Sequence, residues 1–113
     1  MTSREMLFSA LGSETRLRML ELIAAHKEMC GCELVDHFEV AQSAVSAHLH
    51  KLRAAGLVKD RRDGFRVFYR IVPEVMDEAF EQLRASMAKH IEQGRGQDPV
   101  GRVEKRLAQK TLA

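Results

Sequence analysis

The sequence predicts a mainly α-helical fold with one small β-hairpin, an α+β class with the element order α-α-α-α-β-β-α. Apolar residues recur at helical spacing over most of the chain. An Asp-Gly pair at residues 63–64 separates two runs of β-branched and aromatic residues, which is a strong hairpin signal. The 113 residues, of which 30% are charged and 45% hydrophobic, fit one globular domain with a short tail.

Four helices are expected before the hairpin, at about residues 3–11, 14–26, 31–38 and 43–55. Gly12 and Ser13 interrupt the first apolar stripe, and Ser13 is a good N-cap for the second helix. The fourth helix has the clearest pattern, because Val45, Leu49 and Leu52 form one apolar stripe opposite a small polar face. Gly56 follows as a helix-ending residue.

The hairpin strands are expected at residues 57–62 and 65–72, and a last helix should run from Pro73 to about residue 92. That helix carries a wide apolar stripe, made of Val75, Met76, Ala79, Phe80, Leu83 and Met87. A wide stripe on a terminal helix predicts a homodimer, although the helix could instead cover its own core. We therefore expect a domain at residues 1–93, followed by a linker and mobile basic tail at residues 94–113.

Composition excludes several classes of protein. No apolar run approaches the roughly 20 residues that cross a membrane, and the N-terminal residues lack a signal-peptide pattern. We expect a cytoplasmic protein without a membrane partner. Two cysteines cannot form a secreted disulfide framework. The chain has neither a nucleophile motif nor a phosphate-binding glycine loop, so an enzyme is not expected.

Basic residues are concentrated in one segment although the net charge of the chain is only +2. Residues 42–70 contain seven Lys or Arg residues against two Asp residues. Such a stretch is typical of a phosphate-binding surface, although a solvated charged face gives the same pattern.

A short helix, a turn, a polar-faced helix and a basic hairpin together predict a winged helix-turn-helix that binds double-stranded DNA. The polar helix would read the major groove, and the hairpin, or wing, would follow the phosphate backbone. The predicted contacts are Gln42, Ser43, Ser46, Ala47, His50, Lys51 and Arg53 on the helix and Arg61, Arg62 and Arg66 on the wing. A protein-interaction module of the same fold is the alternative.

Four segments resemble the ArsR/SmtB family of metal- and metalloid-responsive repressors, namely residues 13–20, 29–34, 42–58 and 61–71. They occur in family order and with family-like spacing, and the resemblance covers residues 3 to about 92. It implies a dimeric winged helix-turn-helix repressor that leaves its operator DNA when an inducer binds, usually a metal or metalloid.

Cys30 and Cys32 are the predicted inducer ligands. Two thiolates suit trivalent arsenic or antimony first, with cadmium, lead, zinc or copper(I) as alternatives, and no organic cofactor is expected. Residues two apart point about 200° apart in a regular helix, so both can reach one ion only if the helix starts at or after Gly31, a permissive residue. Arsenic-responsive family members carry a similar Cys-x-Cys at this helix start.

A third thiolate is missing, because Val35 stands where some family members have their third cysteine. Binding by three thiolates of one subunit is therefore excluded. The third ligand could be water, hydroxide, a small thiol, His26, His37 or a thiol of the partner subunit.

Redox sensing is an alternative role for the cysteines. They could sense redox or sulfur species, although a simple Cys30–Cys32 disulfide would be strained, which favours metal binding.

A second metal site is suggested by the resemblance. The zinc site on the terminal helix of some family members aligns with Asp77 and His90. Ala79 and Gln93 replace its other two ligands, so half a site remains.

Overall fold

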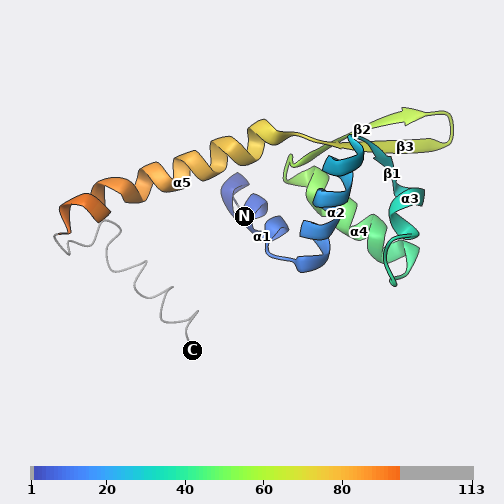
Figure 1. Cartoon of the computed structure of the whole chain (residues 1–113), viewed down its shortest axis with the longest axis horizontal. Coiled ribbons are helices and arrows are strands. Elements are labelled where there is room, and N and C mark those ends of the chain that lie inside the picture. Colours follow the sequence, from blue (N-terminus) through green and yellow to red (C-terminus); the bar gives the residue numbers. More distant parts are fainter. Residues whose placement is uncertain (1, 95–113) are drawn as a thin grey trace. The chain divides into compact units, whose positions relative to one another are not determined.

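The computed structural model describes residues 2–94 and confirms the predicted α+β class (Figure 1). Residues up to Glu81 form one compact unit, and a second unit begins at Gln82. The element order is α1 (Ser3–Leu11), α2 (Glu14–His26), β1 (Met29–Cys30), α3 (Gly31–Val35), α4 (Gln42–Ala54), β2 (Val58–Asp63), β3 (Arg66–Ile71) and α5 (Pro73–Gln93). The strand β1 is an addition to the predicted order.

Local signals set the helix boundaries. The Ser13 side chain accepts a hydrogen bond from the Arg16 backbone N–H, so α2 begins where the sequence predicts. The helix α3 is shorter than predicted and ends at Val35. The backbone N–H groups of His37 and Phe38 bond to carbonyls three residues earlier, so the chain tightens into a turn instead of continuing the helix.

The three strands form one antiparallel sheet in the order β1-β3-β2. Met29 lies opposite Tyr69 and Cys30 lies opposite Phe68. A strand of two residues is too short to show a periodic pattern, which explains why the sequence does not predict it.

The hairpin turn lies one residue later than predicted. Asp63 pairs with Arg66, which leaves Gly64 and Phe65 as the two loop residues. Gly64 has a φ of 63°, and Phe65 does not have a positive φ. A positive φ at the first loop position alone is the pattern of a type II′ turn, whose first loop position favours glycine.

The core lies among α1, α2, α3, α4 and the start of the sheet. Its buried members are Leu7, Ala10, Met19, Leu20, Ile23, Met29, Leu34, Val45, Leu49, Leu52, Leu57 and Val58. Val75, Met76 and Ala79, in the first turns of α5, pack against this cluster. The cluster fixes α4 from its apolar side and leaves the opposite face of that helix in solvent.

One buried charged residue ties α1, α2 and α4 together. The Arg16 guanidinium donates to the carbonyls of Ala10 at 2.7 Å and Ser9 at 3.1 Å, which satisfies the end of α1. Its third contact is with Nδ1 of His48, at 3.1 Å. Because Arg has only donors, His48 must accept at Nδ1 and carry its proton on Nε2. This contact requires a neutral His48.

The second unit is described only by itself and only up to Gly94. Within it, α5 continues to Gln93, with Met87 and Ile91 exposed. Apart from Gly94, the predicted linker and tail lie outside the described residues. No helix in residues 2–94 combines the length and apolar character that crossing a membrane requires.

The Arg16–His48 contact predicts a pH-dependent stability. Burial, followed by the charges of Arg16 and Lys51, lowers the pKa of His48 below its usual value of 6.5. A lowered pKa means that the folded state prefers the neutral ring, so this stabilisation is present above pH 6.5 and is lost as the pH falls through the lowered pKa. His48→Gln should reduce the fall in Tm between pH 7.5 and 5.5. His50→Gln, an exposed control on the same helix, should leave this fall in Tm unchanged. An equal fall in Tm in the two variants would show that His48 does not cause the pH dependence.

Candidate nucleic-acid interface and cysteine site

The face of α4 opposite the core presents short polar and basic side chains. All seven helix residues that the sequence assigns to DNA contact are exposed. Ser43, Ser46 and Ala47 are small, so the backbone of α4 can approach the floor of a groove closely. The helix α3 contacts α4 from behind, as the first helix of a helix-turn-helix does.

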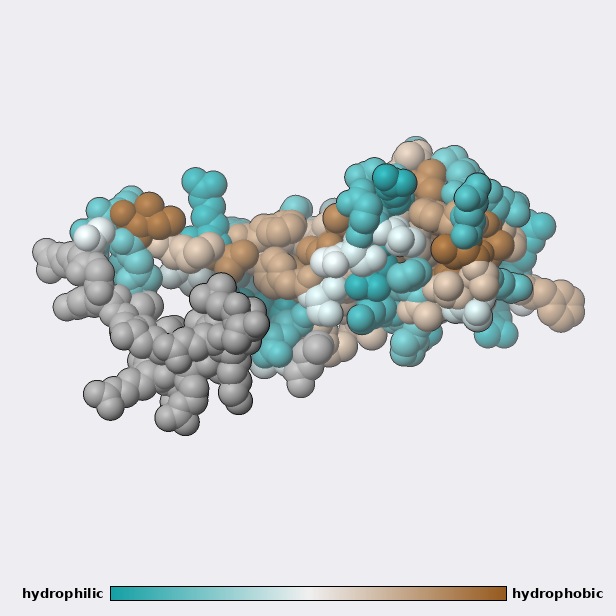
Figure 2. Space-filling model, turned by 90° about the horizontal axis from the view of Figure 1, so that it is seen from below, coloured by the Kyte–Doolittle hydropathy of each residue, from teal (hydrophilic) through white to brown (hydrophobic). Residues whose placement is uncertain are grey.

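The predicted basic contacts fall into two groups. Arg53 lies 3.5 Å from Asp60, and Arg61 forms a salt bridge with Glu28. The other basic contacts are Lys51, Arg62 and Arg66, which are exposed and have no ion pair within residues 2–94. In Figure 2, which views the molecule from below, hydrophilic and hydrophobic side chains are interspersed over the visible face of the first unit. The second group has charges available for phosphate.

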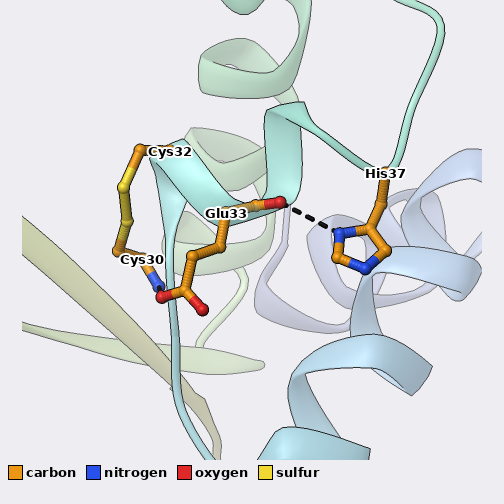
Figure 3. The surroundings of a disulfide bond; sticks show 4 residues. All are labelled: Cys30, Cys32, Glu33 and His37. Atoms are coloured by element: carbon orange, nitrogen blue, oxygen red, sulfur yellow. Dashed lines mark hydrogen bonds between the residues drawn. A yellow bond between two sulfur atoms is a disulfide. The ribbon is translucent and has the colours of Figure 1, made fainter.

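The two cysteines converge although they are only two residues apart. Cys30 has extended backbone angles, φ −80° and ψ 155°, and it immediately precedes α3, which starts at Gly31 as predicted. The Cα atoms are 5.3 Å apart, and the sulfurs are joined as a disulfide (Figure 3). The residue spacing predicts strain in such a bond, and the structure forms it with an extended Cys30 and a Cα separation inside the usual range.

The environment of the pair is asymmetric. Cys30 is 1% exposed, whereas Cys32 is exposed. The Cys30 backbone N–H donates to the Glu33 carboxylate at 3.0 Å, which holds the first turn of α3 against the pair. A reagent in solvent therefore reaches the sulfur of Cys32 first.

The histidines considered as further ligands lie elsewhere. His37 bonds through Nδ1 to the Glu33 carbonyl at 3.0 Å, on the opposite side of α3 from the sulfurs (Figure 3). The His26 ring lies 6.3 Å from the His37 ring. In the part of the chain that the structure describes, no three His, Cys, Asp or Glu side chains form a group suited to a metal ion. The structure thus does not bring these imidazoles to the cysteine pair.

A groove of about 520 Å³ connects the cysteine pair with the DNA-reading surface. Its lining comes from four elements and the wing turn, and consists of Cys30, Gly31, Cys32, Val35, Gln42, Val45, Ser46, Leu49, Phe65, Arg66, Val67 and Tyr69. Three predicted DNA contacts, Gln42, Ser46 and Arg66, therefore share a groove with both cysteines. The sequence places these two sets on separate segments and does not show that they meet.

The aligned half of a zinc site gains no further ligands. Asp77 and His90 are both exposed on α5, in different units of the chain. Among residues 2–94 neither belongs to a group of three metal-ligating side chains. A metal at this position stays a prediction from the resemblance alone.

A polar-faced helix supported by a short helix and followed by a β-hairpin defines the winged helix-turn-helix class of DNA-binding regulators, which are not enzymes. Residues 13–60 match the family model described as bacterial regulatory protein, arsR family. The arsenic resistance transcriptional regulator ArsR2 of Pseudomonas putida is 40% identical over 80 residues, which cover 71% of this chain and 70% of that protein. The chain belongs to the ArsR family.

One further relative agrees with this assignment, and one solved structure has the same fold. The arsenic resistance transcriptional regulator ArsR1 of Pseudomonas putida is 48% identical over 68 residues, or 60% of this chain. The match spans only 53% of ArsR1, about half its length. An ArsR-like transcriptional regulator from Rhodococcus sp. RHA1 has the same fold, with a TM-score of 0.72 at 24% identity over 80% of this chain and 85% of that chain.

Sequence reasoning missed two residues that position the site. His48 contacts Arg16 and helps to orient α4, and Glu28 binds the wing residue Arg61. Hydrogen bonding to Arg61 lowers the pKa of Glu28 below its usual 4.5. The one sequence signal for His48 is its position beside the apolar Leu49, at the edge of the core stripe, while Glu28 carries no local signal.

The polar face of α4 yields a direct prediction. Ser46→Asp should weaken operator binding at least tenfold, about 1.4 kcal/mol, because it places a negative charge in a groove facing phosphates. Its Tm should stay near the wild-type value, since Ser46 is exposed. Ser3→Asp, an exposed control in the first turn of α1, should bind as the wild type does. If both variants bind alike in a gel shift, α4 is not the reading helix.

Gly31 is a second test of the site. Its φ is not positive, and a Cβ there would meet Leu49 at 3.5 Å and Tyr69 at 4.0 Å, which are ordinary contacts. The cysteines converge because Cys30 is extended, so glycine is not needed for backbone freedom. Gly31→Ala should therefore keep the Tm within a few degrees and still form the Cys30–Cys32 disulfide on oxidation. Loss of that disulfide in thiol titration would show that the glycine itself is required.

Proposed function

We propose that the protein is a homodimeric transcriptional repressor that binds operator DNA and is released when an inducer occupies Cys30 and Cys32. The inducer is a thiophilic metal or metalloid, with trivalent arsenic or antimony first. The observation that carries this proposal is the shared groove, in which both cysteines lie beside Gln42, Ser46 and Arg66. A repressor with operator DNA as its partner acts in the cytoplasm.

DNA binding by a dimer follows from helix-turn-helix geometry. Two copies of α4 would enter successive major grooves about 34 Å apart, and the wings would contact the flanking backbone. Lys51, Arg62 and Arg66 have charges available for phosphates, which supports this placement. A protein-interaction module without a DNA role does not require this basic surface.

Dimerisation is supported by an apolar surface on the first unit. A cavity of about 540 Å³ is lined mostly by apolar side chains of α1, α2, β3 and the start of α5, together with Glu21. Phe80 is 50% exposed and Leu17 is 36% exposed at this surface. Exposed large apolar side chains around one hollow favour burial against a second copy.

The inducer chemistry follows from the reduced pair. Arsenic(III) and antimony(III) are soft ions that form bonds to thiolates, and the backbone already holds the two sulfurs on one side. The disulfide must first be reduced to the dithiol, for which two molecules of a small thiol supply two electrons and two protons and become a disulfide themselves. The dithiol then loses both protons when it binds the ion. The two thiolates leave one position for water, hydroxide, a small thiol or a thiol of the partner subunit.

Binding at this position can reach the DNA-reading surface by a short path. Cys30 ends β1 and precedes α3, and α3 contacts α4. A coupling of about 1–3 kcal/mol between the two sites would reduce DNA affinity about 5- to 150-fold. Movement of α3 by an ion at its first turn would supply that coupling.

A thiol-based redox or sulfur-responsive repressor is the second candidate, and the disulfide favours it. A peroxide would oxidise the two thiols to the disulfide, with two electrons passing to the peroxide and two molecules of water leaving. In this version the oxidised pair is the signal, and no ion is needed.

The experiment measures the affinity of the reduced protein for an operator fragment by fluorescence anisotropy, with and without each candidate inducer. Arsenite, antimonyl tartrate or cadmium should lower DNA affinity about 5- to 150-fold for the wild type. Cys30→Ser/Cys32→Ser should bind DNA normally and ignore all three reagents. Ser3→Ala, which keeps both cysteines and changes an exposed residue of α1, serves as a control that still releases DNA.

Two results distinguish the candidates. Release by hydrogen peroxide but not by any of the three ions would replace the metal proposal with the redox proposal. Release of the double serine variant by arsenite would contradict both, because the cysteine pair would then have no part in induction.

A further inference from the structure

Arg61 of the wing holds a carboxylate of its own chain. Its Nε donates to Glu28 Oε2 at 2.9 Å, and its Nη2 donates to Glu28 Oε1 at 2.5 Å. Two parallel hydrogen bonds between a guanidinium and a carboxylate form the strongest and most directional kind of side-chain ion pair. The two residues are 33 positions apart, so this salt bridge fixes one segment relative to another.

The rest of the Arg61 surroundings also compensates its charge. Nη1 lies 3.9 Å from Asp63 Oδ2, and the guanidinium carbon lies 4.7 Å from the centre of the Phe68 ring. One cation therefore faces two carboxylates and the negative face of an aromatic ring. A phosphate at Arg61 would compete with these partners, whereas the neighbouring Arg62 has no ion pair in the part of the chain that the structure describes.

The salt bridge links the segments of the two outer strands of the sheet, on either side of the middle strand β3. Glu28 immediately precedes β1, Arg61 lies in β2, and β3 runs between these two strands. Phe68 of β3 lies opposite Cys30 on one side and opposite Arg61 on the other. Arg61 is therefore level with the buried Cys30, and its salt bridge with Glu28, two residues before Cys30, links the segments of the two outer strands.

We propose that the Glu28–Arg61 salt bridge positions the wing relative to the cysteine pair, so that Arg61 is a positioning residue instead of a phosphate contact. Arg62 and Arg66 then carry the backbone contacts of the wing. A change at Cys30 moves β1, and the salt bridge and the β1–β3 pairing carry that movement to β2. This transmission rests on the proposed induction at the cysteines, but the placement of Arg61 does not.

The first experiment measures the salt dependence of operator binding by reduced, uninduced protein. Each phosphate contact contributes about 0.9 to the slope of log K against log salt concentration. Arg62→Gln, the matched control, should lower the slope by about 1, whereas Arg61→Gln should leave it unchanged. If Arg61→Gln lowers the slope as much as Arg62→Gln does, Arg61 contacts phosphate and the proposal is overturned.

The second experiment measures transmission, with arsenite as the probe. Glu28→Gln and Arg61→Gln should bind arsenite at the cysteines with the wild-type stoichiometry, which is monitored by thiolate–arsenic absorbance. The loss of DNA affinity that arsenite causes should nevertheless be at least threefold smaller in both variants than in the wild type. The charge swap Glu28→Arg/Arg61→Glu should restore release towards the wild-type value, which a general loss of folding would not do. Glu28→Gln is the milder variant if the reversed charges unfold, and wild-type release in Glu28→Gln would contradict the transmission.

The outcomes separate this inference from the proposed function. If arsenite does not release the wild-type protein from operator DNA, the proposal that this ion is the inducer is wrong. The salt dependence of DNA binding still decides the role of Arg61 in that case. If arsenite releases the wild type and both glutamine variants equally, the proposed function stands and the salt bridge has no part in transmission.

Discussion

The backbone pairing of Met29–Cys30 with β3 is the constraint on which the rest of the structure depends. It makes Cys30 the last residue of a strand and the residue that begins α3. The extended backbone required by the sheet also turns its side chain towards Cys32. One short pairing thus builds the cysteine site and attaches it to the wing and to the helix behind α4.

The helix α4, which we propose as the recognition helix, is held from more than one direction. Apolar contacts fix the inner face of α4, and Arg16 fixes the edge that bears His48. A helix held this firmly does not reorient freely in response to a small change. The short helix α3 and the three-stranded sheet meet at the cysteine pair, and we expect these elements to move when the state of the pair changes.

Sequence patterns predicted those features whose signals are local. Helical periodicity located α1, α2 and α4, and Asp63-Gly64 identified the hairpin to within one residue. Long-range pairings could not be predicted, because nothing near Arg61 indicates that Glu28 will face it across the sheet. Charge counting therefore grouped Arg61 with Arg62, although the structure gives them different surroundings.

The candidate site was only half visible in the sequence for the same reason. The spacing of Cys30 and Cys32 was recognisable, and so was the polar face of α4. Their meeting in one groove depends on how α3 and the hairpin pack, and β1, which fixes that packing, is too short to leave a pattern. The sequence also does not show that Cys30 is extended, which is what brings its Cα within disulfide distance of Cys32.

The central claim is that the state of the cysteine pair is transmitted to the DNA-reading elements. Amide hydrogen exchange of the reduced protein, with and without bound arsenite, measures this most directly. We expect altered exchange in β3 at Phe68 and Tyr69 and in the first turns of α4, as well as at residues 30–35. Changes confined to residues 30–35, with β3 and α4 unaffected, would contradict the account.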